Sequence, residues 1–201
     1  MSQRSFQTII ARMVVDTEFR AHVREHGLQS LADDLTPLEQ ERLLQVASDR
    51  GMEATRLVHK DFRLSKLYIM LPLTRFLLGR KRMIREASAF WSVNPPVSHY
   101  FLQEAIDFCD HLLKRLASGL RVKYLYEIVS YERAALELQR PCQHEEAARS
   151  QTVNFNYDPM ILFTQLSRQQ RPRAVPPLRC TLVGTLDEDE NVQWDILKSN
   201  S

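Results

Sequence analysis

Glycine is scarce in this sequence, and cysteine and long apolar runs are scarce as well. The 5 glycines are too scattered to form a loop that wraps a phosphate group, and no G-x-S-x-G stretch occurs. The 3 cysteines, Cys109, Cys142 and Cys180, are widely spaced and contain no C-x-x-C pair. Neither a disulfide framework nor a zinc knuckle is therefore indicated, and we expect free thiols in a reducing compartment.

No part of the sequence predicts a signal peptide or a membrane span. The N-terminal stretch MSQRSFQTIIARM carries a charge at Arg4 and has no apolar core. The most apolar stretch, residues 67–78, is too short to cross a bilayer and contains Pro72 and Arg75. The formal net charge of +2 is too small to indicate a nucleic-acid or membrane partner. We expect a cytoplasmic protein.

Residues 1–140 have the periodicity of successive amphipathic helices. The clearest helix start is Thr36-Pro37-Leu38-Glu39, which supplies the N-cap, the proline and the glutamate of a capping box. We expect that helix to end at Gly51. Pro72 is expected to kink or divide an apolar helix, and Asp158-Pro159 is expected to begin a short one.

The pattern changes near residue 150. Residues 152–157, 180–186 and 192–196 carry apolar side chains at every second position, which is typical of half-buried strands. The polar turn at residues 187–191 joins the last two into a hairpin. Because three short strands cannot close a barrel, such a sheet leaves edges that are either protected or available to an extended peptide.

These patterns predict an α+β protein with two parts. The first, residues 1–119, is a mainly helical body suited to docking a partner. The second, residues 120–201, is a small module of three short antiparallel strands plus helices, suited to recognising a peptide.

Three sets of residues have spacings that invite a chemical role. His22 and His26 lie one helical turn apart and could meet one metal ion, but Val23 stands where the zincin pattern needs glutamate. An exposed helix end is the simpler interpretation. Asp107 could orient the imidazole of His111, but no recognisable nucleophile accompanies them, so an ordinary surface or semi-buried helix pair is the favoured interpretation.

The third set, Cys142 and His144, lies in a polar linker, where a nucleophile lacks the rigid neighbours that catalysis needs. Glu132 falls on the apolar stripe of a helix between Ile128 and Leu136. We expect it to be partly buried and paired with an arginine.

Two basic clusters stand out. The first is Arg75, Arg80, Lys81, Arg82 and Arg85, within a stretch that holds no acid, and the second is Arg168, Arg171, Arg173 and Arg179. They could contact phosphates, dock an acidic partner or simply face solvent. No helix-turn-helix signature accompanies either cluster. No metal-ligand set or catalytic triad can be assembled, so the residues favour a non-catalytic binding or accessory protein.

Four stretches of this sequence resemble the methanobactin biosynthesis protein C (MbnC) family. The stretches are LQEAIDF at residues 102–108, YLYEIVSYER at 124–133, VNFNYDP at 153–159 and VQWDIL at 192–197. The likeness covers about residues 60–200.

The resemblance implies an accessory subunit of a heterodimer. Its partner would be an MbnB-like TIM-barrel iron oxygenase, which would hold the iron, while this chain would hold no cofactor. The complex would use dioxygen to convert cysteines of an MbnA-like precursor into oxazolone–thioamide groups during the synthesis of a copper chelator. This chain would take the leader peptide of the precursor as an added strand, as a recognition element for ribosomally made peptides.

The sequence favours two places for peptide docking. One is the strand Val153, Asn154, Phe155, Asn156 and Tyr157, and the other is the edge of the hairpin at residues 180–196, with Leu182 beside the groove. Ordinary sheet packing is the alternative for each residue.

Arg80, Arg82 and Arg85 are candidates to face the partner enzyme. Two alternatives to the leading hypothesis remain: an accessory protein of a related barrel iron enzyme that modifies another cysteine-containing precursor, and a helical regulator that binds nucleic acid.

Overall fold

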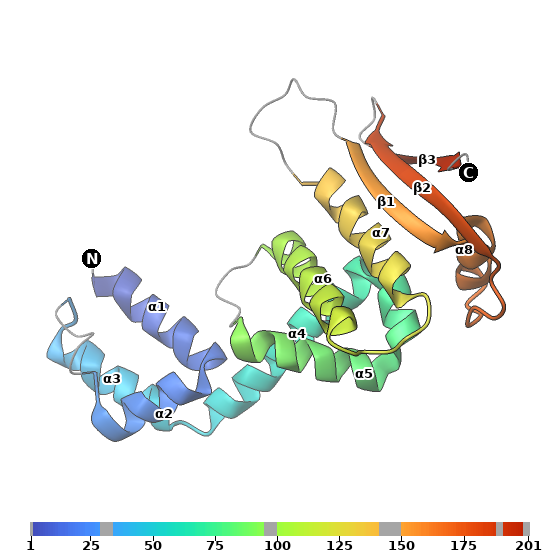
Figure 1. Ribbon diagram of the computed structural model, residues 1–201. Coiled ribbons are helices and arrows are strands. Elements are labelled where there is room, and N and C mark those ends of the chain that lie inside the picture. The colour runs from blue at the N-terminus through green and yellow to red at the C-terminus, as the bar shows by residue number, and fades with distance from the viewer. Residues whose placement is uncertain (1, 29–33, 95–99, 141–149, 188–190, 199–201) are drawn as a thin grey trace. The chain divides into compact units, whose positions relative to one another are not determined.

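The computed structural model describes residues 2–28, 34–94, 100–140, 150–187 and 191–198 (Figure 1). Within these ranges it contains eight helices and one three-stranded antiparallel sheet, which confirms the mainly helical α+β class. The chain divides into two compact units. One comprises Met1–Ser65 and Trp91–His99, and the other comprises Lys66–Phe90 and Tyr100–Ser201. The division near residue 120 suggested by the sequence falls inside the second unit.

The first unit is built from helices α1 (Ser2–Val15), α2 (Thr17–His26) and α3 (Pro37–Ser48), together with the first part of α4 (Gly51–Met70). The helices pack because each carries apolar residues at helical spacing. Their shared core consists of Ile9, Met13, Phe19, Val23, Leu28, Leu35, Leu43, Ala47 and Met52.

The predicted capping box at the start of α3 is confirmed. The backbone N–H of Thr36 donates to Glu39 Oε2 at 2.8 Å, and the N–H of Glu39 donates to Thr36 Oγ1 at 3.3 Å. The predicted end of this helix at Gly51 is wrong, because α3 ends at Ser48 and Gly51 is the first residue of α4. The side chain of Asp49 accepts the N–H of Gly51 at 2.7 Å, so this short segment starts a helix as well as ending one.

Pro72 divides two helices, as the sequence suggested. Helix α4 ends at Met70, and α5 (Pro72–Val93) begins with the proline, which needs no N–H partner at a first helical position. Helix α5 is broken once, at Gly79, whose φ of 72° and ψ of 160° are not helical. The basic residues from Arg80 onward therefore begin a new helical segment.

In the second unit, helix α6 (Phe101–Ala117) packs against α7 (Leu125–Leu138), and α7 in turn lies along the sheet (Figure 1). Strand β1 (Ser150–Tyr157) is followed by helix α8 (Pro159–Ser167), β2 (Pro177–Leu186) and β3 (Val192–Lys198). Asp158 caps α8 as predicted, because its side chain accepts the N–H groups of Met160 and Ile161 at 2.9 and 3.2 Å.

The three predicted strands are confirmed, and their order in the sheet is β1-β2-β3, with both pairs antiparallel. Strand β2 is therefore central, while β1 and β3 are the two edge strands. Helix α7 packs mainly against β1 and to a smaller extent against β2, so the sheet extends past its helical cover towards β3 (Figure 1).

Candidate peptide-binding site

The side of the sheet that faces α7 is well covered at one edge and partly exposed at the other. Val153 of β1 pairs with Leu182 of β2, which pairs with Ile196 of β3, so the three side chains share one face. Val153 is 4% exposed, Leu182 is 3% exposed and Ile196 is 37% exposed. The apolar layer is thus incompletely covered at β3.

Trp194 marks the limit of this cover. Its ring lies 4.8 Å from the ring of Tyr131 on α7, which also contacts Phe163 of α8 at 4.6 Å. Trp194 pairs with Gly184 of β2, where an added Cβ would lie 2.8 Å from the indole ring and 2.9 Å from Leu138. The indole therefore packs directly onto the strand, and only glycine fits beneath it.

The opposite side of the sheet is mostly polar. Thr181 donates its hydroxyl hydrogen to Asn154 Oδ1 at 2.9 Å across the β1–β2 pair. On β3 this face presents Gln193, Asp195 and Leu197, of which Leu197 is 57% exposed. Strand β3 therefore offers partly exposed apolar side chains on both faces, whereas β1 does not.

The structure gives the predicted docking residues several different surroundings. Phe155 is buried against α8, with its ring 5.9 Å from Phe163. Asn156 donates from Nδ2 to Glu127 Oε1 of α7 at 3.4 Å, and Tyr157 packs edge-on against Tyr124.

Like Val153 and Phe155, Leu182 belongs to the core, and its central strand has a neighbour on each side. Trp194 and Ile196 were not among the individual docking residues predicted from the sequence, although alternation in the last strand places them on one face. The sequence does not specify the order of the strands in the sheet, and this order makes β3 an edge strand.

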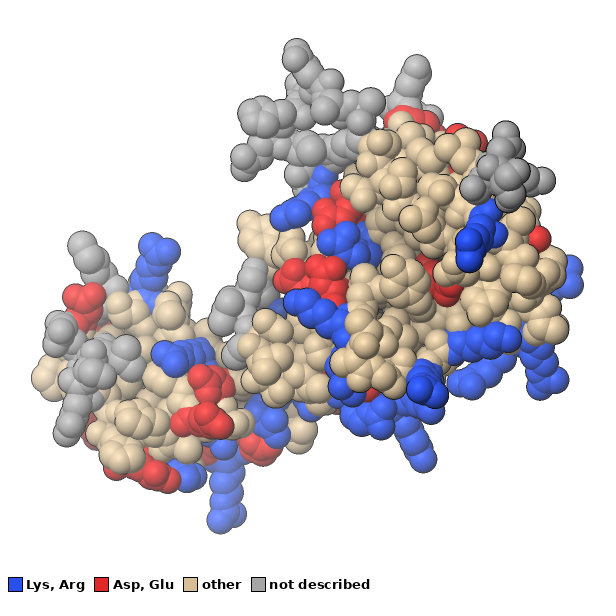
Figure 2. Space-filling view, viewed as in Figure 1, with Lys and Arg blue, Asp and Glu red and all other residues tan. Residues whose placement is uncertain are grey.

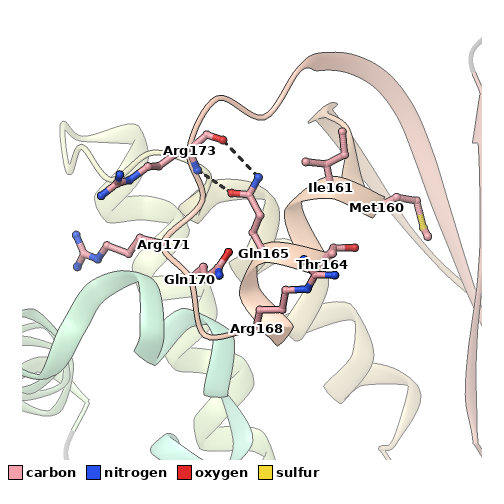
Figure 3. Close-up of a pocket in the computed structure, with 8 residues that line it drawn as sticks. All are labelled: Met160, Ile161, Thr164, Gln165, Arg168, Gln170, Arg171 and Arg173. Carbon is pink, nitrogen blue, oxygen red and sulfur yellow. Dashed lines mark hydrogen bonds between the residues drawn. The ribbon is translucent and has the colours of Figure 1, made fainter.

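An open depression of about 780 Å³ lies between α8 and the segment that follows it (Figure 3). Its lining combines three arginines, two glutamines and a threonine with two apolar side chains near the start of the helix. The lining residues are Met160, Ile161, Thr164, Gln165, Arg168, Gln170, Arg171 and Arg173.

The segment beside this depression is fixed in place by hydrogen bonds. Gln165 Oε1 accepts the N–H of Arg173 at 2.8 Å, and its Nε2 donates to the carbonyl of the same residue at 3.4 Å (Figure 3). The N–H of Val175 donates to the hydroxyl of Tyr124 at 3.2 Å. Arg171 donates to the carbonyl of Leu77 at 3.4 Å, so the segment is held against the break in α5. The side chains lining the depression therefore stand on a well-anchored backbone.

Basic side chains gather on α5 and on the segment after α8. Figure 2 shows them at the lower edge of the second unit. Arg80 and Arg82 are exposed just after the break at Gly79. Arg85 is exposed as well, but it donates to the buried carboxylate of Glu86 at 3.2 Å. All three residues predicted to face a partner therefore lie on the surface of the second unit.

The other candidate sites do not assemble. His22 and His26 stack with ring centroids 4.7 Å apart on an exposed part of α2. The Asp107–His111 interaction that the spacing allowed is not formed. Instead, Asp107 accepts a hydrogen bond from Gln103, while His111 packs between Phe90 and Phe108 with Nε2 3.9 Å from Glu86.

Burial lowers the pKa of the His111 imidazole, which disfavours its protonated form. Cys142 and His144 lie outside the described residues. No cluster of three or more His, Cys, Asp or Glu side chains that could hold a metal ion occurs in the part of the chain that the structure describes.

Glu132 is buried, as expected, but its predicted pairing with an arginine is wrong. Its Oε1 accepts the N–H of Leu73 at 2.8 Å, and its Oε2 accepts the N–H of Thr74 at 2.9 Å. These are among the first N–H groups of α5, which have no partner within their own helix. The carboxyl of α7 thus caps the N-terminus of α5.

No protein-family model matches the chain, and no curated protein is found to be similar to it. None of the helices in the described ranges is long and apolar enough to cross a membrane.

Proposed function

We propose that this chain is a non-catalytic, cytoplasmic subunit that binds a peptide by adding it as a strand to the free edge of β3. The observation that carries this proposal is the partial exposure of Trp194 and Ile196 on the apolar face of an edge strand. An added strand would pair with the backbone of β3, and its alternate apolar side chains would extend the layer that α7 covers elsewhere.

The identity of the peptide follows from the resemblance to the MbnC family. In this proposal the peptide is the leader of an MbnA-like precursor, and its cysteines are modified by an MbnB-like iron oxygenase bound to this chain. Holding the leader raises the effective concentration of the precursor cysteines at the iron of the partner. Arg80, Arg82 and Arg85 are proposed to face that partner.

Proline substitutions test the strand-addition step. Along an antiparallel edge strand the N–H groups point alternately to the neighbouring strand and outward. Asp195→Pro and Ile196→Pro therefore remove one group of each kind. We expect one variant to lower the melting temperature, and the other to fold normally while losing at least about tenfold in affinity for the precursor. Fluorescence anisotropy of a labelled MbnA-like precursor measures the binding.

The matched control is Asn154→Pro on the opposite edge strand, β1. A β1 variant that folds should bind the precursor with unchanged affinity. If the folded β3 variant retains wild-type affinity, addition at β3 is wrong. If in addition the β1 variant loses binding, the peptide docks at the other edge.

A further inference from the structure

Several arginines of this chain form ion pairs with acidic side chains, but the arginines beside α8 form none with a described residue. Arg56 pairs with Glu53, and Arg133 pairs with Asp110. In contrast, Arg168, Arg171 and Arg173 are exposed, and none forms an ion pair with a described residue. Three uncompensated positive charges thus line one depression.

The rest of the lining suits a polypeptide. Met160 and Ile161 are exposed apolar side chains at the start of α8, and Met160 is 63% exposed. Gln165 and Gln170 supply amide groups. Cations beside apolar and amide side chains match a peptide that carries carboxylates and aliphatic groups in alternation. None of the eight lining residues is aromatic, so bases of a nucleic acid would find nothing to stack on.

The depression lies at the end of the sheet where β3 finishes. Tyr157 at the end of β1 pairs with Pro177 at the start of β2, and Cys180 pairs with Lys198 at the end of β3. Helix α8 and its following segment connect β1 and β2 at this same end. A peptide that runs along β3 therefore reaches the end of the sheet at which α8 and its following segment are connected.

We infer that this depression binds an acidic segment of the peptide that pairs with β3. This inference rests on the proposed function and adds a chemical requirement to it: the bound peptide carries Asp or Glu next to its paired stretch. Arg168, Arg171 and Arg173 pair with those carboxylates, while Met160 and Ile161 receive an aliphatic side chain between them. Arg171 is already oriented by its bond to the carbonyl of Leu77.

Charge reversal tests the inference. Arg168→Glu and Arg173→Glu, made together, leave the bond from Arg171 to Leu77 and both backbone bonds of residue 173 in place. The probes are a synthetic peptide with alternating Glu and Leu, its counterpart with Gln in place of Glu, and a random duplex DNA. We expect the double variant to bind the Glu peptide at least about tenfold more weakly at low salt and the Gln peptide with unchanged affinity.

Two controls make each outcome decisive. Arg4→Glu, Gln7→Glu introduces negative charge on the other unit and should leave all affinities unchanged, while melting temperatures verify folding.

If the β3 proline variant loses both peptides but the double reversal loses neither, the proposed function stands and the acidic-segment inference fails. If the reversal weakens the Glu peptide and the proline variants do not, the depression is a peptide site and strand addition fails. Tight binding of the duplex that the reversal abolishes would overturn the inference in favour of nucleic acid.

Discussion

At the scale of single residues, Glu132 joins two helices that are distant in sequence. Its carboxylate takes the place of an N-cap for α5, although it belongs to α7. Burial raises the pKa of this carboxyl to about 7, while the bonds from the backbone of Leu73 and Thr74 act in the opposite direction. The folded protein therefore binds this proton more tightly than the unfolded chain does.

Glu132 therefore contributes a part of the free energy of unfolding that decreases as pH rises. The unfolded carboxyl ionises near 4.5 and the folded one near 7, so the contribution of Glu132 is largest below pH 4.5 and is lost as pH rises through 7. The loss amounts to at most about 3 kcal/mol. We expect Glu132→Gln to remove this pH dependence, as measured by urea unfolding between pH 4 and pH 8.

The difference between wild type and variant isolates this one group. His111 contributes with the opposite sign, because burial lowers the pKa of its imidazole and its contribution therefore rises with pH. That contribution is common to both proteins and cancels in the difference. A difference in unfolding free energy that is constant from pH 4 to pH 8 would contradict the assignment.

At the scale of elements, the contact between Trp194 and Gly184 fixes how β3 sits on the sheet. A methyl group at residue 184 would collide with the indole ring and with Leu138. We expect Gly184→Ala to destabilise the protein by about 1–3 kcal/mol, because both neighbours are large and part of the packed layer. The fluorescence of Trp194, recorded in a Trp91→Phe background, should change as the ring is displaced.

Thr185→Ala is the matched control, because residue 185 points to the other side of the same strand. It should leave the emission spectrum of Trp194 unchanged. If Gly184→Ala shifts neither stability nor fluorescence, the close packing of indole on strand is wrong.

Elements with local signals were predictable from the sequence. The capping box at Thr36 and the cap at Asp158 could be predicted, because the donor and the acceptor of each hydrogen bond lie within a few residues of each other. The three strands could also be predicted, because the alternation of apolar and polar residues is a local pattern. The role of Gly51 was not predicted correctly. The side chain of Asp49 accepts its N–H, and Gly51 begins α4 instead of ending α3.

At the scale of the whole molecule, the proposal requires a partner. We expect co-expression with an MbnB-like barrel to yield a one-to-one complex in which the barrel binds the iron. We expect this chain, purified alone, to contain less than one iron per molecule. Arg80→Glu with Arg82→Glu should weaken the complex, because exposed charges on α5 are proposed to meet the partner. Size-exclusion chromatography with elemental analysis measures both quantities.

Arg4→Glu with Gln7→Glu serves as the charge control here too, and it should leave the complex intact. A purified chain that carries one iron per molecule by itself would contradict the accessory role. If the Arg80→Glu, Arg82→Glu variant forms the complex as well as the wild type does, these arginines of α5 do not face the partner.

The helical majority, the three strands and the lack of a recognisable catalytic motif could be read from the sequence, because they depend on local pattern and residue type. The incompletely covered edge at β3, the capping of α5 by Glu132 and the bond from Arg171 to Leu77 became known only from the fold. Those contacts join residues far apart in the chain. Their partners are selected by packing among helices and strands, and no periodicity in one segment specifies which other segment will lie beside it.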